Sequence, residues 1–208
     1  MTFGNDSIMT RLAACWLFSI MLCIALTPAF ADEAEQVAAT WTVNELMRGM
    51  AQVKKSRASF VEHKYISMLT EPLSYSGTLE YTAPGRLEKR TLRPRPESMV
   101  LDQDRLEVES GDAGKRVLSL QDYPAIWAFV ESIRSTLAGD LETLQRFYQV
   151  KLEGRHKKWK LKLLPLDSKM KDMVREIRIN GSGDQIITIE IREAGGDHSV
   201  MEISRDDS

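Results

Sequence analysis

The three histidines, His63, His156 and His198, are the first candidates for chemistry in this 208-residue chain. They lie far apart in separate segments of strand-like sequence, and no two have the spacing of paired zinc ligands. The only two cysteines, Cys15 and Cys23, both lie in an apolar run near the start of the chain, so no thiol can complete such a site. The sequence therefore predicts no metal site.

Nucleophiles and paired acids also have simpler explanations. The Gly-Ser-Gly stretch at 181–183 lies in a predicted turn between two strands, whereas serine hydrolases place the nucleophile at a strand-to-helix turn. No glycine-rich phosphate loop precedes a helix, so we expect no cofactor. Acidic pairs at 102–104 and 206–207 are explained by turn chemistry and by position at the chain end. We predict a protein that is not an enzyme; a hydrolase of acyl or glycan substrates stays as an alternative without an identifiable nucleophile.

The composition excludes further classes of protein. Apolar residues make up 43% of the chain and charged residues 28%, which is typical of a globular protein. The formal net charge is -2, which gives no electrostatic reason for binding nucleic acid. Two cysteines, both in the first apolar run, exclude a disulfide scaffold.

Residues 1–31 have the layout of a secretory signal peptide, with one arginine, an apolar run over 12–26 and small residues at 29–31. The apolar run is about 15 residues long, shorter than the roughly 20 that span a bilayer. We expect cleavage after this segment, export to the periplasm of a Gram-negative bacterium and a single mature domain over 32–208. A membrane anchor and lipidation at Cys15 are the alternatives.

The spacing of apolar residues predicts the helices and strands that must position any site. It is helical in one segment and has a period of two residues in the next. The capping box at 42–45 and the apolar spacing behind it predict a helix over about 43–55. From residue 57 the period changes to two, and turn residues divide the chain into short strands. The connections are too short for parallel crossovers, so we expect an antiparallel meander. The predicted strands are 57–68, 74–82, 86–93, 97–101, 105–110 and 115–120.

Helical sequence then returns before a second run of strands. Pro124 suits a first helical position, Gly139 ends that helix and Asp140 can cap the next one. The apolar stripe of the first helix consists of Ile126, Val130, Ile133 and Leu137. Five strands are predicted after it, over about 148–153, 157–164, 173–180, 185–193 and 197–204. This pattern predicts an α+β fold: a curved antiparallel sheet with helices over its concave, apolar side.

Five short stretches of the sequence, in order, carry a family resemblance: SRASFVEHKYI, SGTLEYTAPGRL, RPRPESMVLD, LAGDLETLQRFY and KWKLKLLP. Over roughly residues 40–204 the chain resembles the outer-membrane lipoprotein carrier (LolA-like) family, as a divergent member. The resemblance implies an unclosed antiparallel β-barrel of about eleven strands with a helical lid. It also implies a periplasmic carrier whose partners are lipoprotein acyl chains or another lipid, an inner-membrane exporter and an outer-membrane acceptor lipoprotein. We expect a monomer.

One departure from the family concerns the lid. The family's carrier has an arginine before the proline that corresponds to Pro84, and that arginine couples the lid to ligand loading. This chain has Ala83 there, and Arg86 is a candidate substitute. The arginine-rich stretch PGRLEKRTLRPRPE resembles divergent LolA-like proteins found with lipid and aryl-polyene export systems, so the cargo stays open.

The same stretch suggests a docking surface. Arg86, Arg90 and Arg93 are predicted to dock an acidic partner or lipid headgroups. The alternative is a solvated face, because Glu88 and Glu97 interrupt the run of basic residues.

A lipid carrier needs a continuous apolar concavity and a movable lid, because each methylene removed from water contributes about 0.8 kcal/mol. The predicted lining consists of Leu79, Tyr81, Leu87, Met99, Leu101, Trp159 and Leu161 from strands and Trp127, Val130 and Ile133 from the lid. The alternative for each residue is an ordinary core position. The alternative function is a periplasmic sensor or protein-binding module on the same fold, without a transport role.

Overall fold

The computed structural model describes residues 41–111 and 114–205, apart from the side chains of 124–126. The predicted signal peptide, Cys15, Cys23, the side chain of Ile126 and the acidic pair at 206–207 therefore lie outside the described residues. Within the described ranges, no helix is both long enough and apolar enough to cross a membrane.

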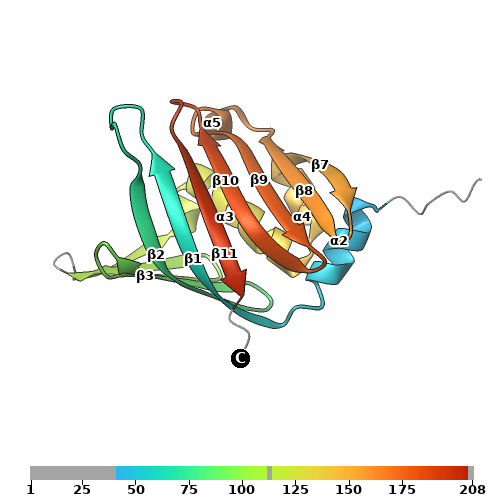
Figure 1. Ribbon diagram of the computed structural model, residues 1–208, viewed down its shortest axis with the longest axis horizontal. Helices are drawn as coiled ribbons and strands as arrows, with labels where there is room; N and C mark the ends of the chain where they lie inside the picture. The colour runs from blue at the N-terminus through green and yellow to red at the C-terminus, as the bar shows by residue number, and fades with distance from the viewer. Residues whose placement is uncertain (1–40, 112–113, 206–208) are drawn as a thin grey trace, which may run out of the picture. The chain divides into compact units, whose positions relative to one another are not determined.

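A single antiparallel sheet of eleven strands forms the body of the protein, in the order β6-β5-β4-β3-β2-β1-β11-β10-β9-β8-β7 (Figure 1). Strands β1 to β6 form one meander and β7 to β11 a second, and β1 pairs with β11 to join them. The outermost strands, β6 and β7, are the two ends of this order, so the barrel is not closed. The predicted α+β fold with an unclosed antiparallel sheet is confirmed.

The strand bounds follow the predicted ones closely, because period-two alternation and turn residues mark most of the strands. The first meander consists of β1 (Lys55–Tyr65), β2 (Leu73–Thr82), β3 (Arg86–Arg93), β4 (Glu97–Asp102), β5 (Arg105–Ser110) and β6 (Gly114–Ser119). The second consists of β7 (Tyr148–Arg155), β8 (Lys158–Pro165), β9 (Val174–Ser182), β10 (Gln185–Glu193) and β11 (His198–Arg205).

Helix α2 (Val43–Met50) begins at the predicted capping box. The Glu45 carboxylate accepts a hydrogen bond from the Thr42 amide at 2.8 Å, and the Thr42 hydroxyl accepts one from the Glu45 amide at 3.3 Å. The helix ends earlier than the predicted residue 55, because the chain must enter β1 at Lys55, where it pairs with Thr82. Local periodicity cannot predict that pairing, because the two residues are far apart in the sequence.

The second helical region follows β6. It consists of η2 (Leu120–Asp122), α3 (Pro124–Ala138) and α4 (Leu141–Phe147). Gly139 ends α3 with a φ of 70°, and the Asp140 carboxylate caps α4 by accepting from the Thr143 amide at 3.0 Å. These hydrogen bonds hold the pKa of Asp140 below its usual value. A short helix, α5 (Ser168–Lys171), which the sequence patterns do not predict, lies between β8 and β9.

The helices cover the concave side of the sheet unevenly (Figure 1). Side chains of α2, α3 and α4 pack with the inward residues of β7, β8 and β9 into one solid core. Its members are Leu46, Met47, Met50, Ala128, Leu144, Tyr148, Trp159, Leu161, Leu163, Met170, Val174, Ile177 and Ile179. Burial in this core raises the pKa of Tyr148 to about 12. The concave face of β1 to β4 is not filled in this way.

Candidate ligand-binding cavity

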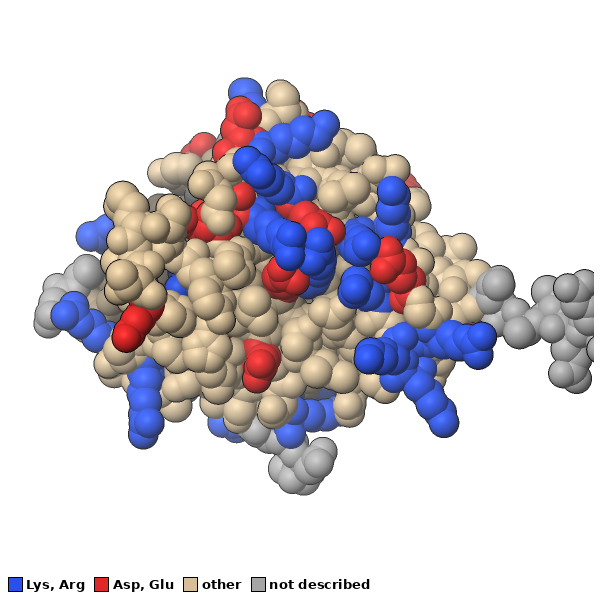
Figure 2. All heavy atoms as spheres, turned by 45° about the horizontal axis from the view of Figure 1, so that its top comes forward, with Lys and Arg blue, Asp and Glu red and all other residues tan. Residues whose placement is uncertain are grey.

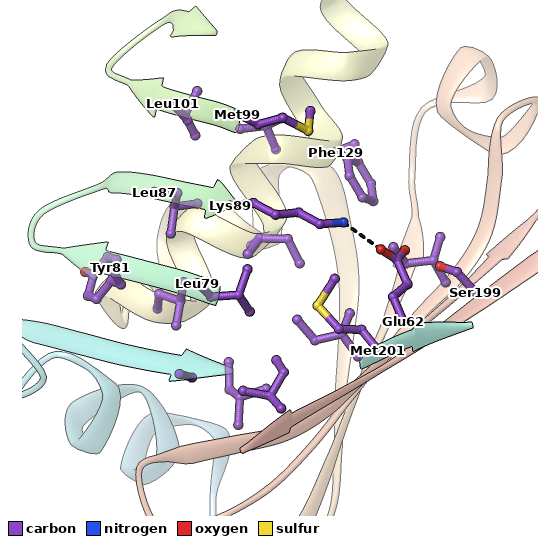
Figure 3. Close-up of a pocket in the computed structure, with 18 of the residues that line it drawn as sticks. Glu62, Leu79, Tyr81, Leu87, Lys89, Met99, Leu101, Phe129, Ser199 and Met201 are labelled. Carbon is purple, nitrogen blue, oxygen red and sulfur yellow. Dashed lines mark hydrogen bonds and ion pairs between the residues drawn. The ribbon is translucent and has the colours of Figure 1, made fainter. Parts of the chain in front are cut away.

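A cavity of about 980 Å³ lies between α3 and the concave face of the sheet around β1 (Figure 3). This volume is at the upper end of the range of about 300–1,000 Å³ in which proteins bind small ligands. The wall is mainly apolar. It includes Leu79, Tyr81, Leu87, Met99, Leu101, Leu106, Met201 and Ile203 from the sheet and Phe129, Val130, Ile133 and Leu137 from α3.

Strand register explains how these side chains come together. Every second residue of a strand faces the concave side, and antiparallel pairing aligns such residues in rows across the sheet. Leu101, Leu87 and Tyr81 form one row over β4, β3 and β2. On the opposite side, Phe129, Val130, Ile133 and Leu137 recur at helical spacing, so one face of α3 covers the cavity.

The structure brings most of the predicted lining residues to this wall. They are Leu79, Tyr81, Leu87, Met99, Leu101, Val130 and Ile133. Tyr81 is only 5% exposed, and burial raises the pKa of its hydroxyl.

Trp159, Leu161 and Trp127 lie elsewhere. Trp159 and Leu161 are 2% and 0% exposed within the solid core, where the Trp159 indole donates to the Gly183 carbonyl at 2.9 Å. Trp127 packs edge-on against Phe147, with ring centroids 5.1 Å apart. Alternation identifies the concave face correctly. The β7–β9 part of that face is covered by α2 and α4, however, and local patterns do not predict this packing because it joins residues that are distant in sequence.

Arg134 of α3 lies at the apolar end of the cavity, beside the turns of the sheet. Its Nη1 donates to the Gln103 carbonyl in the β4–β5 turn at 2.9 Å. Its side-chain carbons also lie against Gly85 in the β2–β3 turn, where an added methyl group would come within 2.6 Å of them. A second nitrogen pairs with Glu131, one turn earlier in α3. Sequence patterns do not identify these contacts between α3 and the two turns.

Arg86, the candidate for coupling to the lid, has different partners. It pairs with Asp102 at 3.3 Å and with Glu88 at 3.7 Å. Arg90 also pairs with Glu88, while Arg93 is exposed at the end of β3. The guanidinium groups of Arg86 and Arg90 are thus balanced by neighbouring carboxylates of the same sheet, whereas the tie between α3 and a sheet turn comes from Arg134.

Polar side chains also line the cavity. At the end away from Arg134 they are Glu62, Lys64, Tyr75, Thr91, Glu97, Asp172, Glu193 and Ser199, and nearer the β2–β3 turn they are Ser56, Gln185 and Arg205. Lys89 extends from β3 toward this end, where its Nζ meets the Glu62 carboxylate of β1 at 2.6 Å (Figure 3). The same Nζ lies 4.9 Å from the centre of the Phe60 ring, a distance suited to a cation–π contact. Sequence analysis did not identify this pair, because its members belong to different strands.

The outer face of the second meander carries pairs of opposite charge rather than a patch of only basic or only acidic side chains. Arg178 pairs with Glu176 at 2.7 Å and with Glu190 at 3.5 Å, and Lys162 pairs with Glu153 at 2.6 Å. Figure 2 shows acidic and basic groups side by side over the middle of the face in view. The Arg178, Glu176 and Glu190 side chains are partly buried, so these pairs compensate charges that are shielded from water.

Two of the three histidines pack against aromatic rings. His198 stacks on Tyr65 with centroids 4.4 Å apart, and His156 meets Trp41 edge-on at 4.9 Å. Over the residues with described positions, no group of three or more His, Cys, Asp or Glu is placed to hold a metal ion.

Comparison with protein families identifies the fold. The model of the family "Outer membrane lipoprotein carrier protein LolA-like" matches residues 31–203. The chain belongs to this family. LolA-like proteins are carrier or binding proteins rather than enzymes, and they are associated with the periplasm and with lipoprotein sorting.

Solved structures that resemble this LolA-like protein have low sequence identity to it. A LolA superfamily protein from Nitrosomonas europaea has 10% identity and a TM-score of 0.44, over 78% of this chain and 91% of its own. An outer membrane lipoprotein-sorting protein domain from Vibrio parahaemolyticus has 8% identity and a TM-score of 0.42, over 80% and 92%. A chain in the structure of the CwlD amidase from Clostridioides difficile in complex with the GerS lipoprotein has 10% identity and a TM-score of 0.36, over 94% and 92%. No curated protein matches the chain.

Proposed function

We propose that this LolA-like protein is a periplasmic carrier that shelters the acyl chains of a lipoprotein or another lipid. It would transfer them from the inner membrane toward the outer membrane. The observation that carries the proposal is the apolar cavity of about 980 Å³ under α3. Such a cavity inside a protein of a carrier family suits hydrocarbon cargo.

The energetics of transfer fit an apolar cavity. A sixteen-carbon acyl chain gains on the order of 12 kcal/mol on leaving water, whether it enters a bilayer or a protein. A carrier therefore needs to match the bilayer only approximately for loading and release to be possible. The cavity wall offers flexible thioethers at Met99 and Met201, which adapt to irregular chain shapes.

The remaining parts of the proposal concern export and partners. Residues 1–31 would act as the cleaved signal peptide, and the mature chain would work as a monomer between an inner-membrane exporter and an outer-membrane acceptor. The cavity-wall residues among those predicted would contact the acyl chains. Of the three arginines proposed for docking, Arg93 is the most available, because Arg86 and Arg90 already pair with carboxylates.

Lipid extraction provides the test. We expect lipids in organic extracts of the purified protein by mass spectrometry, and binding of a fluorescent fatty acid in solution. Ile133→Asp should lower fatty-acid affinity by at least tenfold, because it places a carboxylate on the apolar wall. Leu92→Asp, at a residue that is 60% exposed, is the matched control and should bind normally.

Folding of both variants is checked by circular dichroism and thermal melting. Protein that contains no extractable lipid and ignores the fluorescent fatty acid would contradict the carrier proposal. Unchanged fatty-acid affinity in a folded Ile133→Asp variant would contradict the assignment of the cavity as the binding site.

A further inference from the structure

The cavity wall changes character along the strands. Toward the β2–β3 and β4–β5 turns, the part formed by β2 to β5 consists of leucine side chains and Tyr81. Ser56, Gln185 and Arg205 line the neighbouring ends of β1, β10 and β11. Toward the opposite ends of β1, β3, β4 and β11 the wall includes the polar side chains Glu62, Lys64, Thr91, Glu97 and Ser199. Strand register places Lys64 beside Ser199 and Thr91 beside Glu97, so these groups are neighbours across the sheet. A ligand lying along β2 to β4 would therefore meet leucine side chains at one end and polar side chains at the other.

Charged side chains of both signs line the polar end. Lys64 and Lys89 supply two amines, and the carboxylates are Glu62, Glu97, Asp172 and Glu193. Glu62 is only 8% exposed, and its carboxylate is held by Lys89 at 2.6 Å. The Lys89 side chain passes over the Phe60 ring to reach it. Neither charge of this pair can lose its partner without leaving an uncompensated charge in a largely apolar wall.

The Glu62–Lys89 pair discriminates between headgroups. An anionic headgroup would attract Lys89 but leave the Glu62 carboxylate without its cation, and a cationic headgroup would have the opposite effect. An uncharged headgroup would leave the pair intact but gain nothing from it. A headgroup that carries both signs can place an anion near the amine and a cation near the carboxylate, so that both charges of the pair stay compensated.

We propose that the cavity takes a zwitterionic amphiphile, a lipid with a phosphate and an amine in its headgroup, which lies at the Glu62–Lys89 end. The hydrocarbon then runs along the leucine rows under α3 toward the turn that Arg134 contacts. This inference rests on the proposed carrier function and names the class of lipid that the same cavity selects.

Displacement of a bound fluorescent fatty acid tests the selectivity. The competitors share one sixteen-carbon acyl chain and differ in headgroup: lysophosphatidylethanolamine, lysophosphatidylglycerol and monopalmitoylglycerol. We expect the ethanolamine lipid to displace the probe at a concentration at least tenfold lower than either of the others. Equal potency of the three lipids would overturn the headgroup proposal but leave the carrier function standing, whereas displacement by none of them would contradict both.

Variants of the pair test its role. Glu62→Gln should shift the preference toward the anionic glycerol lipid, because Lys89 is then free to bind phosphate. Glu62→Gln combined with Lys89→Met should reduce the preference for the ethanolamine lipid to less than threefold. The double exchange Glu62→Lys with Lys89→Glu restores a pair and should keep the preference, which separates charge recognition from a folding defect.

The matched control is a pair of the same length on the outer face. Glu153 and Lys162 also lie 2.6 Å apart. Glu153→Gln combined with Lys162→Met should leave headgroup preference unchanged. A loss of preference in this control, or an unchanged preference in the folded Glu62→Gln/Lys89→Met variant, would overturn the proposal.

Discussion

At the residue scale, two glycines have opposite surroundings: Gly77 has no space for a Cβ atom, whereas Gly49 does. A Cβ at Gly77 would lie 1.8 Å from the Arg90 carbonyl oxygen and 3.0 Å from the Phe60 ring. Gly77 stands where β2 and β3 shift register, so close backbone approach requires glycine there. A Cβ at Gly49 in α2 would meet nothing within 4 Å.

We therefore expect opposite effects from one substitution. Gly77→Ala should lower the free energy of unfolding by about 1–3 kcal/mol, because backbone and ring must move. Gly49→Ala should raise it by about 0.5–1 kcal/mol, since alanine loses less conformational entropy in a helix. Urea unfolding followed by circular dichroism measures both. A Gly77→Ala variant as stable as the parent protein would show that the β2–β3 contact is looser than described.

The Glu62–Lys89 pair is a second residue-scale feature, and it shows how cavity chemistry depends on side chains from separate strands. Each residue alone looks like part of an alternating strand. Only the register, which places β1 and β3 on either side of β2, brings the two charges together over Phe60.

At the element scale, α3 has the properties of a lid. Its buried hydroxyls bond within the helix: Ser132 donates to the Phe129 carbonyl at 2.6 Å, and Thr136 donates to the Ser132 carbonyl at 2.7 Å. Moving the helix would leave those bonds intact. Two other bonds connect α3 to the sheet: the Tyr148 hydroxyl of β7 donates to the Ala128 carbonyl at 3.5 Å, and Arg134 donates to the Gln103 carbonyl. The Arg134 bond lies at the cavity end and would break on opening there.

Arg134→Met should loosen this end of α3 while keeping most of the side-chain bulk. A hydrogen bond from a charged group contributes about 1.5 kcal/mol or more, so we expect release of a bound fatty acid to become about tenfold faster. Stopped-flow release of a fluorescent fatty acid measures the rate, and hydrogen exchange measures the opening of α3.

Arg146→Met is the control for this prediction. Arg146 pairs with Glu142 at 2.7 Å within the exposed face of α4, where a pair contributes little. It should release the fatty acid at the parent rate. Identical rates in the Arg134→Met and Arg146→Met variants would mean that the Arg134 bond does not limit opening.

At the scale of the whole molecule, the concave side of one sheet supports two different interiors. The β7–β9 part is a solid core under α2, α3 and α4, and the part around β1 to β4 is open under α3. One buried alanine lies in each part, so substitutions at these two positions can test the difference. Ala128 is 3% exposed in the solid core, and Ala58 is 7% exposed on the cavity wall.

Enlarging each alanine should distinguish a cavity from a core. Ala128→Leu should lower the free energy of unfolding by about 1–3 kcal/mol, because a packed core has no room for added methyl groups. Ala58→Leu should change it by less than about 1 kcal/mol while reducing the amount of bound lipid, since the new side chain enters the void. Thermal melts and lipid mass spectrometry provide the two readouts. Equal destabilisation by both would argue against a void at Ala58.

The sequence alone determined most of the elements and their faces, although it missed α5 and the end of α2. The capping box at Thr42, the end of α3 at Gly139 and the cap of α4 at Asp140 depend on residues a few positions apart, so local patterns predict them. Period-two alternation likewise identified the inward side chains of each strand, Trp159 and Leu161 included.

The tertiary structure decided what lies opposite those inward side chains. Trp159 and Leu161 meet α2 and α4, whereas Leu79 and Leu87 face open space under α3. The contact of Arg134 with the β4–β5 turn and the pairing of Glu62 with Lys89 were decided in the same way. The physical reason is that periodicity encodes which face of an element is apolar, while the group that covers this face depends on how distant segments pack.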